Sequence, residues 1–502
     1  MFEDRTDKVL DILLAYDKDL KAAISKSPPL TLKELSQVGY YGFREATLIE
    51  PFWNAYFLGI VISIAEEIEK KRISEDEKKV FSYRYQWNEA DGSLFKDSTW
   101  IDYKMQCIKY SESFEYILQT DISNFYPRIN HHRLENELER IDPQKSVARK
   151  IMSLLGVFSN SISYGLPVGG PASRILAELA LNSTDLYLNS EKILFCRYAD
   201  DYTIFCTNES DAYEKLIILS KELSHIQLSL QKDKTKIMKS DEFRDIHSLL
   251  DPNKGLSFLD DEQKLLNISI RYDPYSASAD EDYTNLKEAI REIDIIGILS
   301  KEVNKTRIDQ TIAKQAINAI KIISKENQVN AIKILLDLNN LTTLSPVFTT
   351  IMRSVRSIYE ELNITSKDFV DQSLISLMNS ENFLNQIDLN ISYMLQILAI
   401  RHSLEKEEIF LKLFKNTENL LIKRQIIVAL SNWNLHYRLT KFKSDFVSRT
   451  IWERRVIIYA SYFLGDEGEH WRKITQKFFN PEEDIVNDWC KSRKEKRQLI
   501  LV

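Results

Sequence analysis

Two adjacent acids, Asp200 and Asp201, lie between two short apolar segments within residues 193–206. Both flanking segments are rich in β-prone residues, so each predicts a strand, and the acids mark the turn of a hairpin. Adjacent carboxylates repel each other by roughly 4 kcal/mol at 4 Å and an effective dielectric of 20. A bound divalent cation would offset this repulsion, so the turn predicts a metal site on an antiparallel sheet.

Two segments earlier in the chain carry features that match this turn. Residues 120–129 place Asp121 at the end of a strand-like run and follow it with the aromatic pair Phe125 and Tyr126. Residues 164–178 form a glycine-containing loop that enters a predicted helix. An isolated aspartate after a strand is usually a turn former or a helix cap, and an isolated acidic turn is usually solvated. The three segments in this order together indicate a catalytic site.

Glycine is scarce in this chain, with 12 residues in all, yet four lie close together: Gly156, Gly165, Gly169 and Gly170. Glycine permits positive φ angles and lets a backbone approach a ligand closely. The clustering predicts a substrate contact, for which Gly169 is the candidate residue. A tight turn into a helix would by itself explain one or two of these glycines.

The hydrophobic pattern divides the chain into three parts. Residues 1–95 are mostly helical in pattern. Residues 96–270 alternate strand-like and helical segments, which predicts an α+β domain with an antiparallel sheet. A polar break at residues 271–282 follows. Residues 283–502 predict consecutive helices, either stacked pairs of the HEAT-like type or a single irregular helical domain.

Composition narrows the class of protein. The net charge of −7 argues against a protein coated with nucleic acid but allows a positive charge confined to one groove. The four cysteines form no CxxC pair and have no nearby histidine cluster. We therefore expect neither a zinc site nor a disulfide framework, which fits a reducing cytoplasm. The longest mainly apolar run, residues 57–65, is too short to span a membrane.

Aromatic and cationic residues alternate near the C-terminal end. Bases stack on aromatic side chains at about 1–3 kcal/mol each, so a channel for a single nucleic-acid strand is one prediction. Packing between helices with salt bridges is the other. The residues concerned are Trp433, Arg438, Trp452, Arg454, Arg455, Trp471 and Arg472.

In combination, the three acidic and glycine-containing segments resemble motifs A, B and C of reverse transcriptases. The matching residues are Asp-x-x-x-Phe-aromatic at 121–126, Gly-Leu-Pro-x-Gly at 165–169 and Tyr-x-Asp-Asp at 198–201. Residues 228–237 resemble the motif that follows, with the pair Lys234 and Thr235. The resemblance implies an α+β right-hand polymerase fold, with fingers and an antiparallel palm sheet, followed here by the all-α HEAT-like domain.

The resemblance also implies roles for individual residues. Asp121 and Asp200 would be ligands of two magnesium ions, with Asp201 in support and manganese as the alternative metal. Tyr126, beside Phe125, falls where the family places an aromatic ring against the sugar 2′ carbon, which implies a preference for deoxynucleoside triphosphates. The alternative is an ordinary core tyrosine.

Two cationic residues and one glycine complete the predicted nucleotide site. Arg84 is the candidate for the triphosphate, because arginine offers planar bidentate contacts to phosphate; a surface salt bridge is the alternative. Lys234 is predicted to assist the leaving group, unless it is simply solvated. Gly169 is predicted to contact the nucleotide.

One residue departs from the template-copying pattern. Where these enzymes usually carry glutamine within Leu-Pro-Gln-Gly, this chain has Val168. This variant, together with the residues 82–84 and 273–276, resembles the bacterial abortive-infection (Abi) reverse transcriptases of the AbiK-like group, with a length closest to the smaller member of P2-type prophages. That resemblance implies template-independent, protein-primed synthesis, with single-stranded DNA covalently attached to a cytoplasmic homo-oligomer that protects bacteria from phage.

Protein priming requires a hydroxyl on a mobile segment. The candidates are Tyr40 and Tyr41, which flanking glycines set in a flexible sequence, and Tyr16; the alternative is a turn with buried rings. Two other functions remain open. One is a template-directed, RNA-dependent DNA polymerase, and the other is a catalytically silent scaffold that recognises a phage component.

Overall fold

The computed structural model describes residues 1–90, 92–96, 100–247, 261–265, 290 and 293–496. The chain forms two compact units, which we call the sheet unit (residues 19–31 and 46–254) and the helical unit (residues 1–18, 32–45 and 255–502). Residues 1–95 contribute to both units, although the sequence-based division treats them as one part. That three-part division stays a prediction. The polar break expected at 271–282 lies outside the described residues.

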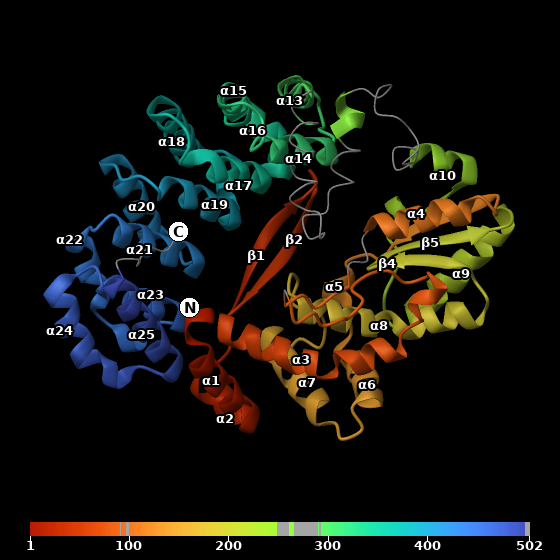
Figure 1. Cartoon of the computed structure of the whole chain (residues 1–502), viewed down its shortest axis with the longest axis horizontal. Coiled ribbons are helices and arrows are strands. Elements are labelled where there is room, and N and C mark those ends of the chain that lie inside the picture. Colours follow the sequence, from red (N-terminus) through yellow and green to blue (C-terminus); the bar gives the residue numbers. More distant parts are fainter. Residues whose placement is uncertain (91, 97–99, 248–260, 266–289, 291–292, 497–502) are drawn as a thin grey trace. The chain divides into compact units, whose positions relative to one another are not determined.

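The sheet unit contains a four-stranded antiparallel sheet in the order β4-β5-β3-β6 (Figure 1). Its strands are β3 (Tyr116–Asp121), β4 (Phe195–Tyr198), β5 (Asp201–Cys206) and β6 (Lys236–Lys239). Its helices are α2 (Leu20–Lys26), α3 (Pro51–Lys71), α4 (Trp100–Ser111), α5 (Phe125–Arg128), α6 (His131–Ile141), α7 (Ser146–Phe158), α8 (Pro171–Ser190), α9 (Glu209–His225) and α10 (Ser240–Ile246). The antiparallel sheet was predicted from the alternation of short strands and helices.

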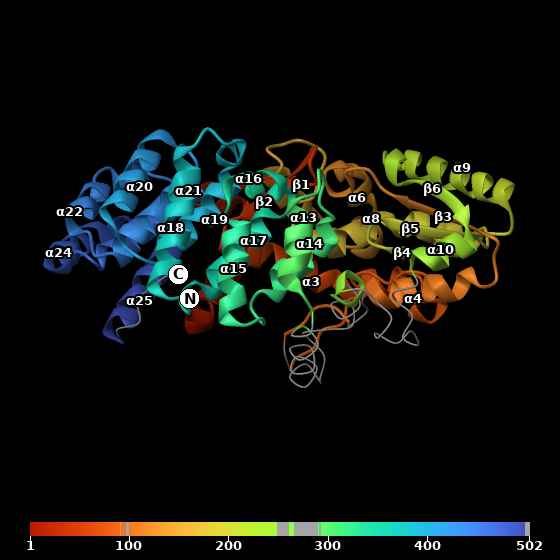
Figure 2. The same ribbon diagram turned by 90° about the horizontal axis from the view of Figure 1, so that it is seen from above.

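Helices cover both faces of this sheet. Alternate side chains of each strand point to opposite faces, so each face presents side chains for a helix to pack against. On one face, Ile117, Cys196 and Phe205 pack with Tyr103 of α4 and Phe243 of α10. Helix α9 packs against β3 and β5 on the other face (Figure 2). The central strands β3 and β5 are therefore largely buried, which holds the residues at their ends in fixed positions.

The helical unit is built from consecutive short helices and one hairpin. Its helices are α1 (Thr6–Lys18), α13 (Ile295–Val303), α14 (Gln310–Ala319), α15 (Lys325–Leu335), α16 (Leu338–Thr343), α17 (Phe348–Tyr359), α18 (Ile364–Asn379), α19 (Asp388–Leu398), α20 (Leu404–Asn416), α21 (Leu420–Asn432), α22 (His436–Leu439), α23 (Ile451–Ser461), α24 (Gly465–Thr475) and α25 (Pro481–Glu495). Helices α14, α17, α19, α21, α23 and α25 pack one against the next (Figure 1). The helical character is confirmed, whereas the HEAT-like repeat stays a prediction.

The hairpin of β1 (Thr31–Val38) and β2 (Gly42–Ile49) was not predicted, since residues 1–95 were expected to be mostly helical. The turn between the strands contains Gly39 at φ +68°, a conformation that glycine adopts without strain. None of the described helices is both long and apolar enough to cross a membrane.

Candidate active site

The register of β3 and β5 brings the three predicted acids to one end of the sheet. Asp121, the last residue of β3, lies directly opposite Asp201, the first residue of β5. The backbone N–H of Ile122 donates a 3.2 Å hydrogen bond to the carbonyl oxygen of Asp200. Asp201 also pairs with Tyr198 of β4, so the acidic turn is fixed by strands on both sides.

Burial and mutual repulsion shift the acids away from their ordinary ionisation. Burial, and then the neighbouring carboxyl of Asp121, raise the pKa of Asp200 to about 7. Burial and Asp121 also raise the pKa of Asp201, although Lys104 and Lys234 act in the opposite direction. Such a cluster of partly buried acids is stabilised by a nearby cation.

Lys234 is the cation in direct contact with these acids. Its ammonium group forms an ion pair with the Asp121 carboxylate. Next to it, Thr235 Oγ1 lies 2.7 Å from Thr120 Oγ1, which ties the lysine-bearing segment to β3. The Lys234 side chain is 63% exposed, so it can leave this contact when a ligand enters. The structure thus brings Lys234 to the predicted acids.

The glycine-containing loop lies against the short helix α5. The backbone N–H of Leu166 donates a 2.9 Å hydrogen bond to the carbonyl oxygen of Tyr126, and that of Gly165 donates one to Ile129. Gly165 has φ +95°, and an added Cβ would lie 3.3 Å from the Pro127 carbonyl oxygen. Glycine is therefore required here by both conformation and space.

A buried arginine forms a hydrogen bond with the backbone of the acidic turn. Arg197 of β4 has no exposed surface, and its Nη1 donates a 2.7 Å hydrogen bond to the carbonyl oxygen of Ala199. Its Nη2 forms ion pairs of 2.6 Å with Asp185 and 2.8 Å with Glu178, both on α8. Ala199 itself has φ +53°, an uncommon conformation for a residue with a side chain.

The same acids are shared with a second arginine and two hydroxyl groups. Arg72 forms a 2.6 Å ion pair with Glu178, and Ser82 donates a 2.6 Å hydrogen bond to it. The hydroxyl of Tyr202 donates to Asp185 at 3.0 Å. Burial alone would raise the pKa of Glu178, but Arg197 and Arg72 outweigh it and the pKa is lowered. Glu178 is therefore ionised, and the network joins α8 to the acidic turn.

Comparison with known proteins identifies this region. Residues 62–257 match the family described as "Reverse transcriptase (RNA-dependent DNA polymerase)". The chain carries a reverse transcriptase domain. The protein is therefore a nucleotidyltransferase of reverse transcriptase type. Among solved structures, a telomerase from Candida albicans with a TWJ fragment of telomeric RNA matches at 11% identity and a TM-score of 0.31, covering 82% of this chain and 67% of that chain. No curated protein sequence matches.

The acids of the reverse transcriptase domain have the ligand type that a divalent metal ion needs but, within the described residues, not a complete set of ligands. Carboxylate oxygens are the ligands that Mg²⁺ prefers, and Asp121 lies close enough to Asp200 to raise the pKa of the Asp200 carboxyl. Across the described ranges, no group of three or more His, Cys, Asp or Glu side chains is arranged to hold a metal ion. That Asp121 and Asp200 would hold the metal, with Asp201 in support, therefore stays a prediction.

Arg84 lies in an environment that disfavours its predicted contact with a triphosphate. Its side chain is 2% exposed, and each of its three nitrogens already donates to a protein oxygen. Nη1 forms a 2.7 Å ion pair with Glu69, and the other acceptors are the carbonyl oxygens of Val80 and Ile73. These contacts favour the salt-bridge alternative for Arg84, whose role in binding the triphosphate stays an untested prediction.

An arginine that sequence reasoning did not single out acts on the same tyrosines as Asp200. The Arg174 guanidinium, in the first turn of α8, lies 5.0 Å from the ring centre of Tyr83. Burial, then Tyr83, Glu178 and Asp200, raise the pKa of Tyr126. Tyr83, Tyr126 and Arg174 therefore share one site with Asp200. Arg174 belongs to the quoted glycine-loop segment, so its position at the helix start was an available signal.

The predicted aromatic pair takes two different environments. Phe125 is buried and its ring lies 5.4 Å from that of Tyr126, which is half-buried. Gly169 has φ +125°, and no atom lies within 4 Å of an added Cβ. Gly169 thus faces open space, as a residue approached by a ligand would.

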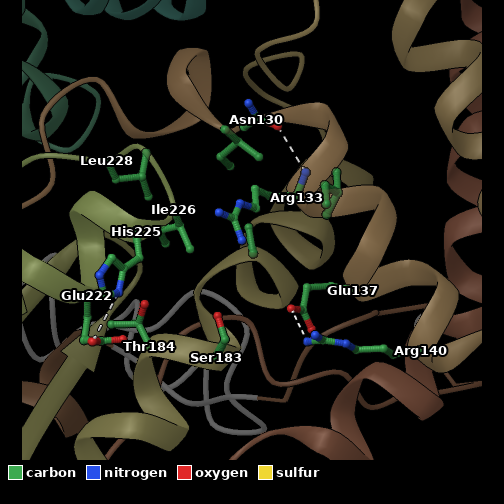
Figure 3. A pocket seen from close by; sticks show the side chains of 13 residues that line it. Asn130, Arg133, Glu137, Arg140, Ser183, Thr184, Glu222, His225, Ile226 and Leu228 are labelled. Carbon is green, nitrogen blue, oxygen red and sulfur yellow. Dashed lines mark hydrogen bonds and ion pairs between the residues drawn. The ribbon is translucent and has the colours of Figure 1, made fainter.

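A separate cavity of about 220 Å³ lies between α6, α8 and α9 (Figure 3). Arg133 extends into it, and Arg140 is paired with Glu137 at its edge. None of the predicted nucleotide-site residues lines this cavity.

The three candidate priming tyrosines differ in accessibility within the helical unit. Tyr16 is buried and its hydroxyl donates to Glu482. The Tyr40 hydroxyl donates to the Thr343 carbonyl oxygen at 2.8 Å and accepts from the Ile308 N–H at 2.9 Å. Tyr41 is 81% exposed, and its hydroxyl accepts one hydrogen bond from Arg307. Of the three, Tyr41 alone combines high exposure with an accessible hydroxyl.

Proposed function

We propose that this protein is an antiphage DNA polymerase of the abortive-infection type, which synthesises DNA without a template on a hydroxyl of its own chain. The reverse transcriptase match and the assembled acids support polymerisation. The observation that carries the finer proposal is Val168, an apolar residue in the loop position where template-copying enzymes use a glutamine. An apolar side chain removes an amide that could hydrogen-bond the nucleotide and its surroundings.

The residues of the site suit a nucleotidyl transfer. In this reaction a hydroxyl oxygen forms a bond to the α-phosphorus of a deoxynucleoside triphosphate, the bond from that phosphorus to the bridging oxygen breaks, and pyrophosphate leaves. Metal ions held by Asp121 and Asp200 would supply the charge that stabilises both oxygens. Tyr126 restricts the space at the sugar, and Arg174 is the cation that we propose for the triphosphate, in place of Arg84.

For the first nucleotide, we propose the hydroxyl of Tyr41 as the acceptor. A priming hydroxyl must be free to approach the nucleotide, and Tyr41 is the exposed candidate. Tyr16 and Tyr40 would each have to break buried or paired hydrogen bonds first. The product would stay covalently attached to a homo-oligomer in the bacterial cytoplasm.

Incubation of the purified protein with Mg²⁺ and deoxynucleoside triphosphates alone tests the proposal. We expect DNA that stays with the protein in denaturing gels and is released by protease. D200N, with the acid replaced by its neutral isostere, should form none. DNA that appears only with an added RNA strand, and copies it, would overturn template independence.

Template-directed copying of RNA is the second candidate, and the family match to RNA-dependent DNA polymerases favours it. Sequencing of products made with and without a defined RNA separates the two. A catalytically silent scaffold is the third candidate. If cells carrying D200N resist phage as well as wild-type cells, that third function is the correct one.

A further inference from the structure

The cations that the sequence singled out in the helical unit already have partners. Arg438 forms a 2.7 Å ion pair with Glu407, and Arg454 forms one of 2.6 Å with Glu483. Arg472 donates a 2.7 Å hydrogen bond to the Ser461 carbonyl oxygen. These three arginines thus take part in packing between helices, which was the second of the two sequence-based interpretations. A ligand-binding site in the helical unit would therefore involve other residues.

Arg424 of α21 lies in a different environment. Over the described part of the chain, no residue forms an ion pair or a hydrogen bond with its guanidinium, which lies 5.9 Å from the ring centre of Trp452. Burial, and then the like charge of Arg455, lower the pKa of Arg424. A half-buried cation that lies near another cation is costly, because charges removed from water need partners.

This guanidinium lines a cavity of about 660 Å³ formed by residues of α17, α19 and α21 and the segments that follow them. Arg356 of α17 also lines the cavity, and its Nη1 donates a 2.5 Å hydrogen bond to Gln396 Oε1. Gln425 and Trp433 add an amide and an aromatic edge. One acid, Glu360, is among the lining residues. Figure 1 shows α17, α19 and α21 side by side in this unit.

We propose that this cavity, which we call the Arg424 cavity, binds the phosphate group of a nucleotide or of a single-stranded DNA. Two guanidiniums line this cavity, and each suits a phosphate, because arginine donates parallel hydrogen bonds to phosphate oxygens. The volume is in the range of small-ligand sites, which is about 300–1,000 Å³. The site is made by the helical unit alone and goes beyond the proposed polymerisation.

Calorimetric titration of the full-length protein with three probes tests the site: inorganic phosphate, thymidine monophosphate and a ten-residue oligothymidylate. Magnesium is left out and D200N is used as the background, so that no nucleotide is incorporated and binding at the polymerase acids is weakened. R424Q should bind the preferred probe at least tenfold more weakly, as expected for the loss of charge-assisted hydrogen bonds. K423Q is the matched control, because Lys423 is the adjacent residue and is paired with Glu418.

Binding that is retained in K423Q and lost in R424Q supports the site. The probe that binds most tightly then shows whether the bound phosphate group comes from free phosphate, a nucleotide or a DNA strand. Equal binding by R424Q, equal losses in both variants, or no binding of any probe would overturn it. Should R424Q fail to fold, R356Q takes its place with the same expected loss. Because binding is read without catalysis, failure of this site leaves the polymerase proposal unaffected, and the reverse also holds.

Discussion

The guanidinium of Arg197 donates a 2.7 Å hydrogen bond to the carbonyl oxygen of Ala199, the residue immediately before Asp200. The acidic turn is thus held from inside the sheet unit rather than from the solvent side. Since Ala199 adopts a positive φ angle, the turn needs such support to persist.

Arg197 is therefore expected to act as a positioning residue. R197K keeps the charge but loses the forked contacts, so kcat should fall at least roughly tenfold while KM for the nucleotide changes less than about twofold. R197M removes the ion-pair partner of buried Asp185 and one of the two arginines paired with Glu178, so it should lower the free energy of unfolding by about 3–5 kcal/mol. Steady-state kinetics and urea melts measure these effects. R140K, in an exposed ion pair of the same unit, is the control.

Asp200 should make stability depend on pH. Its pKa is about 7 in the folded protein and near 3.8 when unfolded, so between these values the folded state binds more protons. The free energy of unfolding therefore falls as pH rises through that window. Relative to D200N, which cannot titrate there, wild type should lose about 1–3 kcal/mol between pH 5 and pH 8. Urea melts without metal at both pH values measure it, and an unchanged difference would contradict the assigned shift.

Any side chain at Gly165 should lower the stability of the folded protein. G165A places a Cβ 3.3 Å from the Pro127 carbonyl oxygen at a positive φ angle, so we expect a loss of about 1–3 kcal/mol in stability and a displaced loop. G156A, at a helical glycine with no atom within 4 Å, should be neutral or stabilising by up to about 1 kcal/mol. Thermal melts of the pair decide this, and equal effects would argue against strain.

Tyr126 should limit incorporation of ribonucleotides. Y126A opens the space beside the sugar, so the preference for deoxynucleotides should fall at least roughly tenfold, whereas Y126F keeps the ring and should keep the preference. The measurement is the ratio of kcat/KM for a deoxynucleotide and its ribonucleotide. A preference that survives Y126A would assign the ring to the core alone.

Tyr41 should carry the first nucleotide. Y41F removes the hydroxyl while keeping the ring, so protein-linked DNA should be lost, while Y16F and Y40F should retain it. Mass spectrometry of the protease-digested adduct locates the linkage directly. An adduct on a serine, or on another tyrosine, would exclude Tyr41.

The motif residues could be placed from sequence because they follow local rules. Asp121 and Asp200 end or turn strands, and the glycines mark a loop where positive φ angles are needed. The network behind them could not be placed, since Glu178 and Arg197 read as ordinary charged residues until α8 packs against β4. The contacts of Arg84 could not be placed for the same reason, because its ion-pair partner Glu69 lies 15 residues earlier, on α3. The hairpin at residues 31–49 was missed because its half-exposed strands alternate only weakly.

The division of the chain between the two units has a consequence for how such a protein could arise. The backbone passes from one unit to the other four times, after residues 18, 31, 45 and 254. Joining two genes end to end yields a single crossing, so simple fusion does not produce this arrangement. The N-terminal helix α1 packs against α25 within one unit, so residues that precede the sheet unit's segments and residues that follow them build one packed interface.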